Sequence, residues 1–246
     1  MDYVNRAYRR GMRPAGFTGF NCKYKETDLY VAVDEKSFVP ELVKTVEKRI
    51  LYYRFILEGY IRRDRDFQIT HKPYLLPPTA PLLARAMAKA GNMAGTGPMA
   101  AVAGAFAEFI GHDLLQFADE VIVENGGDIF LAVKEKAKIS VFAGESPLSN
   151  RLALELKPQE NGFGVCTSSG TVGHSFSYGR ADAVVIVSPS AILADAVATA
   201  AANLVQTSAD LQKAVDFARN IEGITGVLAI KDDKIAAWGD IKLVRV

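Results

Sequence analysis

Two alanine-rich stretches restrict the fold of this chain most. Each lies among short runs that resemble strands, so helices and strands must pack together. One follows Pro98 and extends to about Phe109, and the other follows Ser188-Pro189 and extends to about Val205. Serine before a proline in the first helical turn is typical of a helix start. We therefore expect two small-residue helices, whose short side chains let another backbone or a ligand approach closely.

The remaining segments alternate between strands and helices without a regular βαβ period. The pattern predicts a hairpin from the first two strands and a long amphipathic helix with apolar residues every three or four positions. It also predicts a helix near 208–220. Further expected elements are strands at 16–24, 28–33, 120–123, 128–133, 138–142, 152–156, 164–166, 183–187, 226–230, 234–238 and 241–246, and helices at 40–63 and 81–90. This order predicts an α+β fold in one domain over residues 1–246, with a soft boundary near 64–80.

Charge and cysteine content exclude several classes of protein. With 29 Lys and Arg against 28 Asp and Glu, the net charge is +1, so nucleic acid is a poor candidate partner. The two cysteines form no CxxC pair and predict neither a zinc site nor a disulfide framework. The N-terminal arginines are not followed by an apolar run, and no segment is long enough to cross a bilayer. We expect a cytoplasmic protein that binds no membrane.

The first candidate site segment is Glu124-Asn125-Gly126-Gly127-Asp128, between two apolar strands. Asn-Gly is a strong signal for a two-residue hairpin turn. The same residues suit a ligand site, because paired glycines leave the backbone bare and flanking carboxylates accept hydrogen bonds. Both interpretations are compatible.

The second segment, residues 166–180, is rich in glycine and hydroxyl groups and contains His174. Such a loop offers backbone N–H groups and hydroxyls to oxyanions. The alternatives are a flexible surface loop, or a nucleophile (Cys166, Ser168 or Ser169) paired with His174. No G-x-S-x-G motif supports the nucleophile.

The third segment is Ala194-Asp195-Ala196-Val197-Ala198-Thr199-Ala200 on the second alanine-rich helix. Spacing i, i+4 places the oxygens of Asp195 and Thr199 on one helix face. Hard oxygen ligands of this kind suit Mg²⁺, completed by water and phosphate. The alternative is that Asp195 binds a backbone N–H or an arginine, with Thr199 bonding along its own helix.

These three segments, in this order, resemble the ApbE-like family of flavin transferases. The matching residues are Gly126-Gly127-Asp128-Ile129, then Thr167-Ser168-Ser169-Gly170 with His174-Ser175, and then the 194–200 run. The sequence is still more similar to a narrower, uncharacterised branch related to that family, through Thr27-Asp28-Leu29, residues 97–104, 123–128 and 166–183.

The resemblance implies an α+β fold of the tunnelling-fold type, with two similar halves around a central cleft. It implies FAD and Mg²⁺ as ligands, with Asp195, Thr199 and the carbonyl of Ala103 on the metal. If the protein cleaves FAD, His174 is the candidate acid or base. The residues implied to contact the nucleotide are Gly97, Pro98, Met99, Glu124, Asn125, Gly126, Gly127, Asp128, Thr167, Ser168, Ser169, Gly170, Ser175 and Tyr178. One departure concerns the family's helix lysine, whose place is taken here by Gly104.

Three functions remain in view. The first is Mg²⁺-dependent binding of FAD or a related phosphate-containing metabolite, with cleavage of FAD for FMN transfer. The second is a non-catalytic nucleotide or metabolite binding module, and the third is an unrelated hydrolase. The sequence names neither the true ligand nor an acceptor, and it leaves open whether the chain forms a homo-oligomer.

Overall fold

The computed structural model describes residues 15–171 and 178–246 of the chain. In chain order the strands are β1 (Phe17–Tyr24), β2 (Thr27–Asp34), β3 (Val121–Asn125), β4 (Asp128–Ala132), β5 (Ala137–Ser140), β6 (Leu152–Leu156), β7 (Phe163–Ser168), β8 (Ala183–Ser188), β9 (Gly226–Lys231), β10 (Lys234–Gly239) and β11 (Lys242–Arg245). The α-helices are α1 (Glu41–Arg63), α2 (Arg65–Ile69), α3 (Leu82–Ala94), α4 (Val102–Leu114), α5 (Ala191–Asn203) and α6 (Leu211–Arg219). Short 3₁₀ helices, Pro98–Ala101 and Ser208–Asp210, precede α4 and α6.

The strands form two sheets. The larger has eight strands in the order β1-β2-β3-β4-β7-β8-β9-β10, and each neighbouring pair is antiparallel. The smaller has the order β11-β6-β5. Side chains alternate between the two faces of a strand, so β1–β4 and β7–β9 of the large sheet contribute to two separate cores, whereas β10 is mostly exposed.

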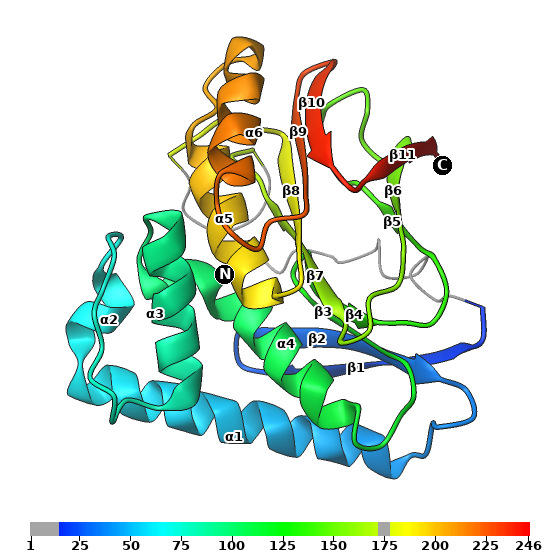
Figure 1. Ribbon diagram of the computed structural model, residues 1–246. Coiled ribbons are helices and arrows are strands. Elements are labelled where there is room, and N and C mark those ends of the chain that lie inside the picture. Colours follow the sequence, from blue (N-terminus) through cyan, green and yellow to red (C-terminus); the bar gives the residue numbers. More distant parts are fainter. Residues whose placement is uncertain (1–14, 172–177) are drawn as a thin grey trace.

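Three layers result from this alternation. The helices cover one face of the large sheet, where Val121, Phe130 and Ile186 pack beneath them. The small sheet covers the other face through Val141, Leu154 and their neighbours (Figure 1). Helix α5 contacts β7 and β8 below it and lies against both α3 and α4. The second alanine-rich stretch is therefore a central element of the helical layer.

Most expected elements are present, and the differences occur at boundaries. The segment 64–80, where the sequence predicts a soft boundary, contains the short helix α2. Its N-terminus is capped by Asp64, which accepts the Phe67 N–H at 3.3 Å. Helix α3 was expected to end near residue 90 but continues to Ala94. Helix α4 passes through Gly111 as one helix to Leu114. Mixed helix and sheet agree with the predicted α+β class.

Within residues 15–171 and 178–246, no single helix is both long and apolar enough to cross a bilayer. Only α3 combined with residues 98–114 reaches that length and composition, as a pair bent by 103°.

Candidate functional site

The turn between β3 and β4 is a rigid two-glycine hairpin. Gly126 and Gly127 have φ angles of 72° and 106°, in the region that favours glycine. The Gly127 N–H donates to the carboxylate of Glu124 at 2.9 Å, and the Glu124 side chain is fully buried. Glu124 therefore holds the turn, which the sequence interpretation had allowed beside a role in ligand contact.

Three polar side chains form a row across the sheet beside this turn. Asn125 pairs with Asp128 between β3 and β4, and Asp128 pairs with Cys166 between β4 and β7. Directly paired residues point to the same face. Cys166 belongs to the core beneath the helices, so the row faces the helical layer.

Each end of this row contacts a helix. The Asn125 side-chain amide donates to the carbonyl of Ala103, in the first turn of α4, at 3.2 Å. The Cys166 thiol donates to the carbonyl of Ala191, the first residue of α5, at 3.3 Å. Asp128 therefore lies between the strand residues that contact α4 and α5.

Asp195 joins the two helices from the other side. Its carboxylate accepts the Gly104 N–H at 2.8 Å, and it also interacts with the Ala103 N–H. The first N–H groups of a helix lack partners within the helix, so Asp195 satisfies the start of α4. The backbone bond that the alternative interpretation expected for Asp195 is present, but a carboxylate has further lone pairs and can still bind a cation.

Close packing makes this arrangement possible. A side chain at Gly104 would overlap the Ala191 carbonyl and the Cβ of Asp195. A side chain at Gly164 would overlap Ala191 itself. Helices α4 and α5 and strand β7 thus meet through glycine and alanine, as expected from the small residues of both helices.

Electrostatics in this group oppose negative charge. Burial, and then the charge of Asp195, raise the pKa of Asp128 well above its usual range. Burial also raises the pKa of Asp195 to about 7, despite the two backbone N–H groups of α4. No lysine or arginine of the described segments forms an ion pair with either carboxylate.

The donor atoms of this group decide which metal ion it could hold. Within residues 15–171 and 178–246, no three His, Cys, Asp or Glu side chains are grouped so as to hold a metal. Asp195, Asp128 and the hydroxyl of Thr199 offer hard oxygens, which suit Mg²⁺ when water or phosphate completes its six ligands. The residues therefore fit a magnesium ion bound together with a phosphate-containing ligand.

Thr199 and Asn203 continue the polar line along α5. Both are half-buried, and Asn203 accepts the Tyr178 N–H at 2.8 Å. Tyr178 is 60% exposed, and its ring lies 6.2 Å from that of His71. The line thus leads from the buried carboxylates to an exposed aromatic pair.

His71 was assigned no functional role from the sequence. Its backbone packs so closely on Gly97 that a side chain at Gly97 would overlap Thr70 and contact His71. Gly97 and Pro98 are buried and Met99 is half-buried. The 97–99 segment therefore lies beneath residues 70–71, and no sequence signal links it with Tyr178.

The described hydroxyl-rich residues at the end of β7 lie beside Asp128 and Ala181. Thr167 supplies a backbone hydrogen bond to Asp128, and the Thr167 carbonyl lies 4.0 Å from where a Gly127 Cβ would be. Ser168 ends β7. Gly170 donates its N–H to the Ala181 carbonyl at 2.9 Å, and Ser169 also donates to it at 3.3 Å.

Two of the predicted residues, His174 and Ser175, lie outside the described residues. The nucleophile interpretation of Cys166 is disfavoured. Its thiol is fully buried, and burial and the charges of Asp128 and Asp195 raise its pKa well above the usual value. A thiol in this state is not ionised and has no access to a substrate.

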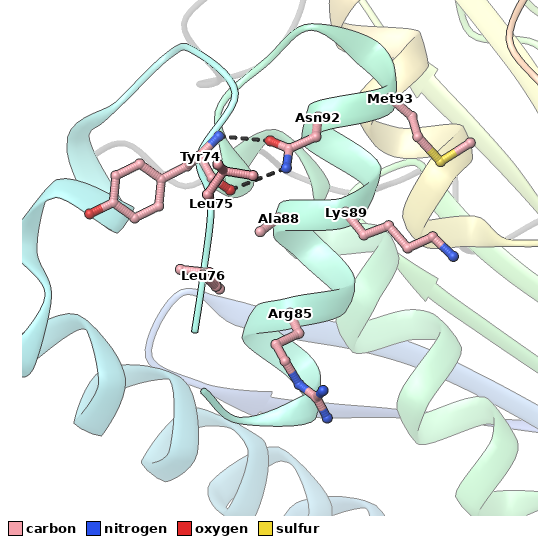
Figure 2. Close-up of a pocket in the computed structure, with 8 residues that line it drawn as sticks. All are labelled: Tyr74, Leu75, Leu76, Arg85, Ala88, Lys89, Asn92 and Met93. Atoms are coloured by element: carbon pink, nitrogen blue, oxygen red, sulfur yellow. Dashed lines mark hydrogen bonds between the residues drawn. The ribbon is translucent and has the colours of Figure 1, made fainter. Parts of the chain in front are cut away.

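A separate pocket of about 530 Å³ lies between α3 and the segment 74–76 (Figure 2). The Asn92 amide fixes that segment by accepting the Tyr74 N–H at 2.7 Å and donating to the Tyr74 carbonyl at 3.2 Å. Arg85, Lys89 and Met93 line the pocket along α3. It contains none of the residues predicted for the site.

Similarity to known proteins identifies the family of this chain. A family model described as AbpE bacteria matches residues 10–237. The chain belongs to this family. Among its relatives, the UPF0280 protein of Methanococcus vannielii is 42% identical over 222 residues, which is 88% of each protein. The UPF0280 protein of Methanosarcina acetivorans is 39% identical and covers 88% of this chain and 85% of that protein.

Solved structures show the fold of this AbpE-family chain. The flavin transferase ApbE from Vibrio cholerae covers 92% of this chain and 97% of its own, with a TM-score of 0.53 at 12% identity. The ApbE protein from Thermotoga maritima covers 89% and 96%, with a TM-score of 0.57 at 14% identity. The fold is therefore ApbE-like, as the resemblance implied.

Proposed function

We propose that the protein binds FAD, or a related phosphate-containing metabolite, together with Mg²⁺ beside the β3–β4 turn, the end of β7 and helix α5. The observation that carries this proposal is the pair of buried carboxylates, Asp128 and Asp195, neither of which forms an ion pair with a lysine or arginine of the described residues. The glycine-rich turn and the hydroxyl-rich segment beside them suit a nucleotide. The ApbE-like fold supports flavin as the first ligand to test.

Different residues of the chain would bind the metal and position the phosphate. Asp195 and Thr199, one helical turn apart, would hold the metal, with the carbonyl of Ala103 as a further oxygen. Bound Mg²⁺ would neutralise the phosphate charge and polarise a phosphoryl oxygen. Asn125 fixes the Ala103 carbonyl, and Glu124 fixes the turn that lies against Thr167.

Residues on the exposed side would contact the organic part of the ligand. Gly97, Pro98, Met99, Ser168, Ser169, Gly170, Ser175 and Tyr178 complete the proposed nucleotide contacts, and His174 is the proposed acid or base. We add His71 to these proposed contacts, because its ring lies 6.2 Å from that of Tyr178. These assignments predict that ligand contacts lie on one side of the helical layer.

A second candidate function, binding without turnover, is supported by Gly104. The resemblance places a lysine of the flavin transferases at this position, and here no side chain fits, because the Ala191 carbonyl and Asp195 occupy the space. The protein would then lack that ammonium group while keeping the carboxylates. Nucleotide binding with weak or absent FMN transfer is the expected result.

The test separates binding from turnover. Purified protein is incubated with FAD and Mg²⁺, and free AMP and FMN are measured beside the FAD retained. Retained FAD without product supports the binding module, whereas AMP release with FMN on an acceptor peptide supports the transferase. A protein that retains no FAD with Mg²⁺ contradicts the flavin proposal in both forms.

A further inference from the structure

Asp128 differs from the other buried carboxylates in its partners. The residue is only 8% exposed. Its buried Oδ1 atom makes no hydrogen bond to any described residue. A buried carboxyl oxygen without a hydrogen-bond partner is costly, so this atom points to a missing ligand. By contrast, Asp34 accepts bonds from Ser37, Asp119 and Glu120, and Asp182 accepts from Lys231 and the Asp232 N–H.

The position of Asp128 explains what that ligand would be. On one side, its strand partner Asn125 contacts Ala103 at the start of α4. On the other, its strand partner Cys166 contacts Ala191, which lies one turn before Asp195 on α5. Asp195 itself contacts Gly104, the residue after Ala103. The two carboxylates therefore face the same small space from the sheet and from the helices.

We propose that Asp128 is a ligand of the same divalent cation as Asp195, so that one carboxylate from the sheet and one from α5 hold the ion between them. This inference rests on the proposed function and adds a residue to the metal set that the family resemblance implies, in which Asp128 belongs to the nucleotide contacts. Hard carboxylate oxygens at this place suit Mg²⁺ or Mn²⁺. Two carboxylates balance the charge of a divalent ion, so the ion should bind before any phosphate arrives.

The experiment titrates Mn²⁺ into the full chain without nucleotide, and free Mn²⁺ is followed by electron paramagnetic resonance. Wild type is compared with Asp128→Asn and Asp195→Asn, which keep size and one oxygen. Asp34→Asn is the matched control, because Asp34 is a buried carboxylate that accepts bonds beside the start of β3, whereas Asp128 lies beside its end. Loss of one carboxylate ligand should weaken Mn²⁺ binding roughly tenfold or more in both site variants, and Asp34→Asn should bind as wild type does.

Thermal unfolding provides a second readout that does not depend on activity. Asp128→Asn should unfold at a higher temperature than wild type without metal, because burial opposes a carboxylate at this position and the amide is neutral, and Mn²⁺ should raise its midpoint less. If Asp128→Asn binds Mn²⁺ as tightly as wild type, or if Asp34→Asn weakens binding as much, the inference is wrong. A wild type that binds Mn²⁺ through Asp128 but no FAD would contradict the proposed function and leave this inference standing.

Discussion

Gly104 lies where α4 and α5 touch, and its lack of a side chain sets the distance between them. Its N–H donates to Asp195, and a Cβ there would overlap the Ala191 carbonyl. Gly104→Ala should therefore destabilise the protein by about 1–3 kcal/mol through overpacking. Chemical denaturation measures the change in unfolding free energy.

Gly59→Ala is the matched control for this substitution. Gly59 lies within α1, and a Cβ there would meet only the Arg62 side chain, at 3.7 Å. Alanine in a helix interior is more favourable than glycine by about 0.5–1 kcal/mol. The two substitutions should act in opposite directions, and a neutral Gly104→Ala would show that α4 and α5 are packed less tightly than described.

The two thiols should be unreactive in the folded protein. Cys22 and Cys166 are buried and not in a disulfide, and burial together with the charge of Glu47 raises the pKa of Cys22 to about 11. A thiol reacts as the thiolate, which free cysteine forms near pH ~8.5. Raising the pH toward 9 should therefore speed labelling by Ellman's reagent only after denaturation. Rapid labelling of either thiol under native conditions would contradict the burial.

Single residues also show how far the sequence could lead. The i, i+4 spacing of Asp195 and Thr199 correctly places both on one helix, and Asn125-Gly126-Gly127-Asp128 correctly predicts a turn. The approach of Asp128 to Asp195 was not predictable from either pattern, because it depends on the pairing of β4 with β7 and on the packing of β7 under α5. The His71–Tyr178 contact likewise joins distant segments that carry no common pattern.

Helix α5 begins with a cap that comes partly from another helix. Ser190 accepts the Leu193 N–H at 3.3 Å and donates its hydroxyl to Glu108 of α4 at 2.9 Å. Glu108 also accepts the Ile192 N–H at 3.0 Å. The carboxylate thus stabilises the positive end of α5 and fixes it to α4.

Glu108→Ala should cost about 1–2 kcal/mol, because an orphan N–H and a serine hydroxyl lose their acceptor. Glu108→Gln keeps one oxygen and should lose less. Both are measured as changes in unfolding free energy. Equal losses in the two variants would show that the charge matters and the hydrogen-bond acceptor does not.

Most element types followed from the sequence, whereas the short helix α2 and the ends of α3 and α4 did not. The sequence predicts a helix end near residue 90, but α3 continues through Gly91 to Ala94, and the missing side chain of Gly91 leaves room for the carbonyls of Thr96 and Gly97. Gly111 lies inside α4, where the Phe130 ring occupies the space of its missing side chain. In both cases a glycine serves packing between segments, and local propensity points to a break that does not occur.

At the scale of the whole molecule, we expect a binding protein with little transferase activity. The protein keeps the carboxylates Asp128 and Asp195 where the large sheet, α4 and α5 meet. Gly104 leaves no room for the lysine that the resemblance to flavin transferases predicts at this position. Incubation with FAD, Mg²⁺ and a generic threonine-containing acceptor peptide should leave the peptide unmodified by mass spectrometry. Efficient addition of FMN to the peptide would contradict this prediction.

Calorimetric titration of FAD, with and without Mg²⁺, tests the central claim most directly. Wild type should bind FAD only when Mg²⁺ is present, and Asp195→Ala should abolish that binding. The chain should stay folded, because removal of a buried charge without an ion-pair partner offsets the loss of an acceptor for the Gly104 N–H. Asp195→Asn restores an acceptor for the Gly104 N–H and controls for packing, while Thr199→Ala should weaken binding. Equal FAD affinity in wild type, Asp195→Ala and Thr199→Ala, or FAD binding by wild type that is indifferent to Mg²⁺, would contradict the account.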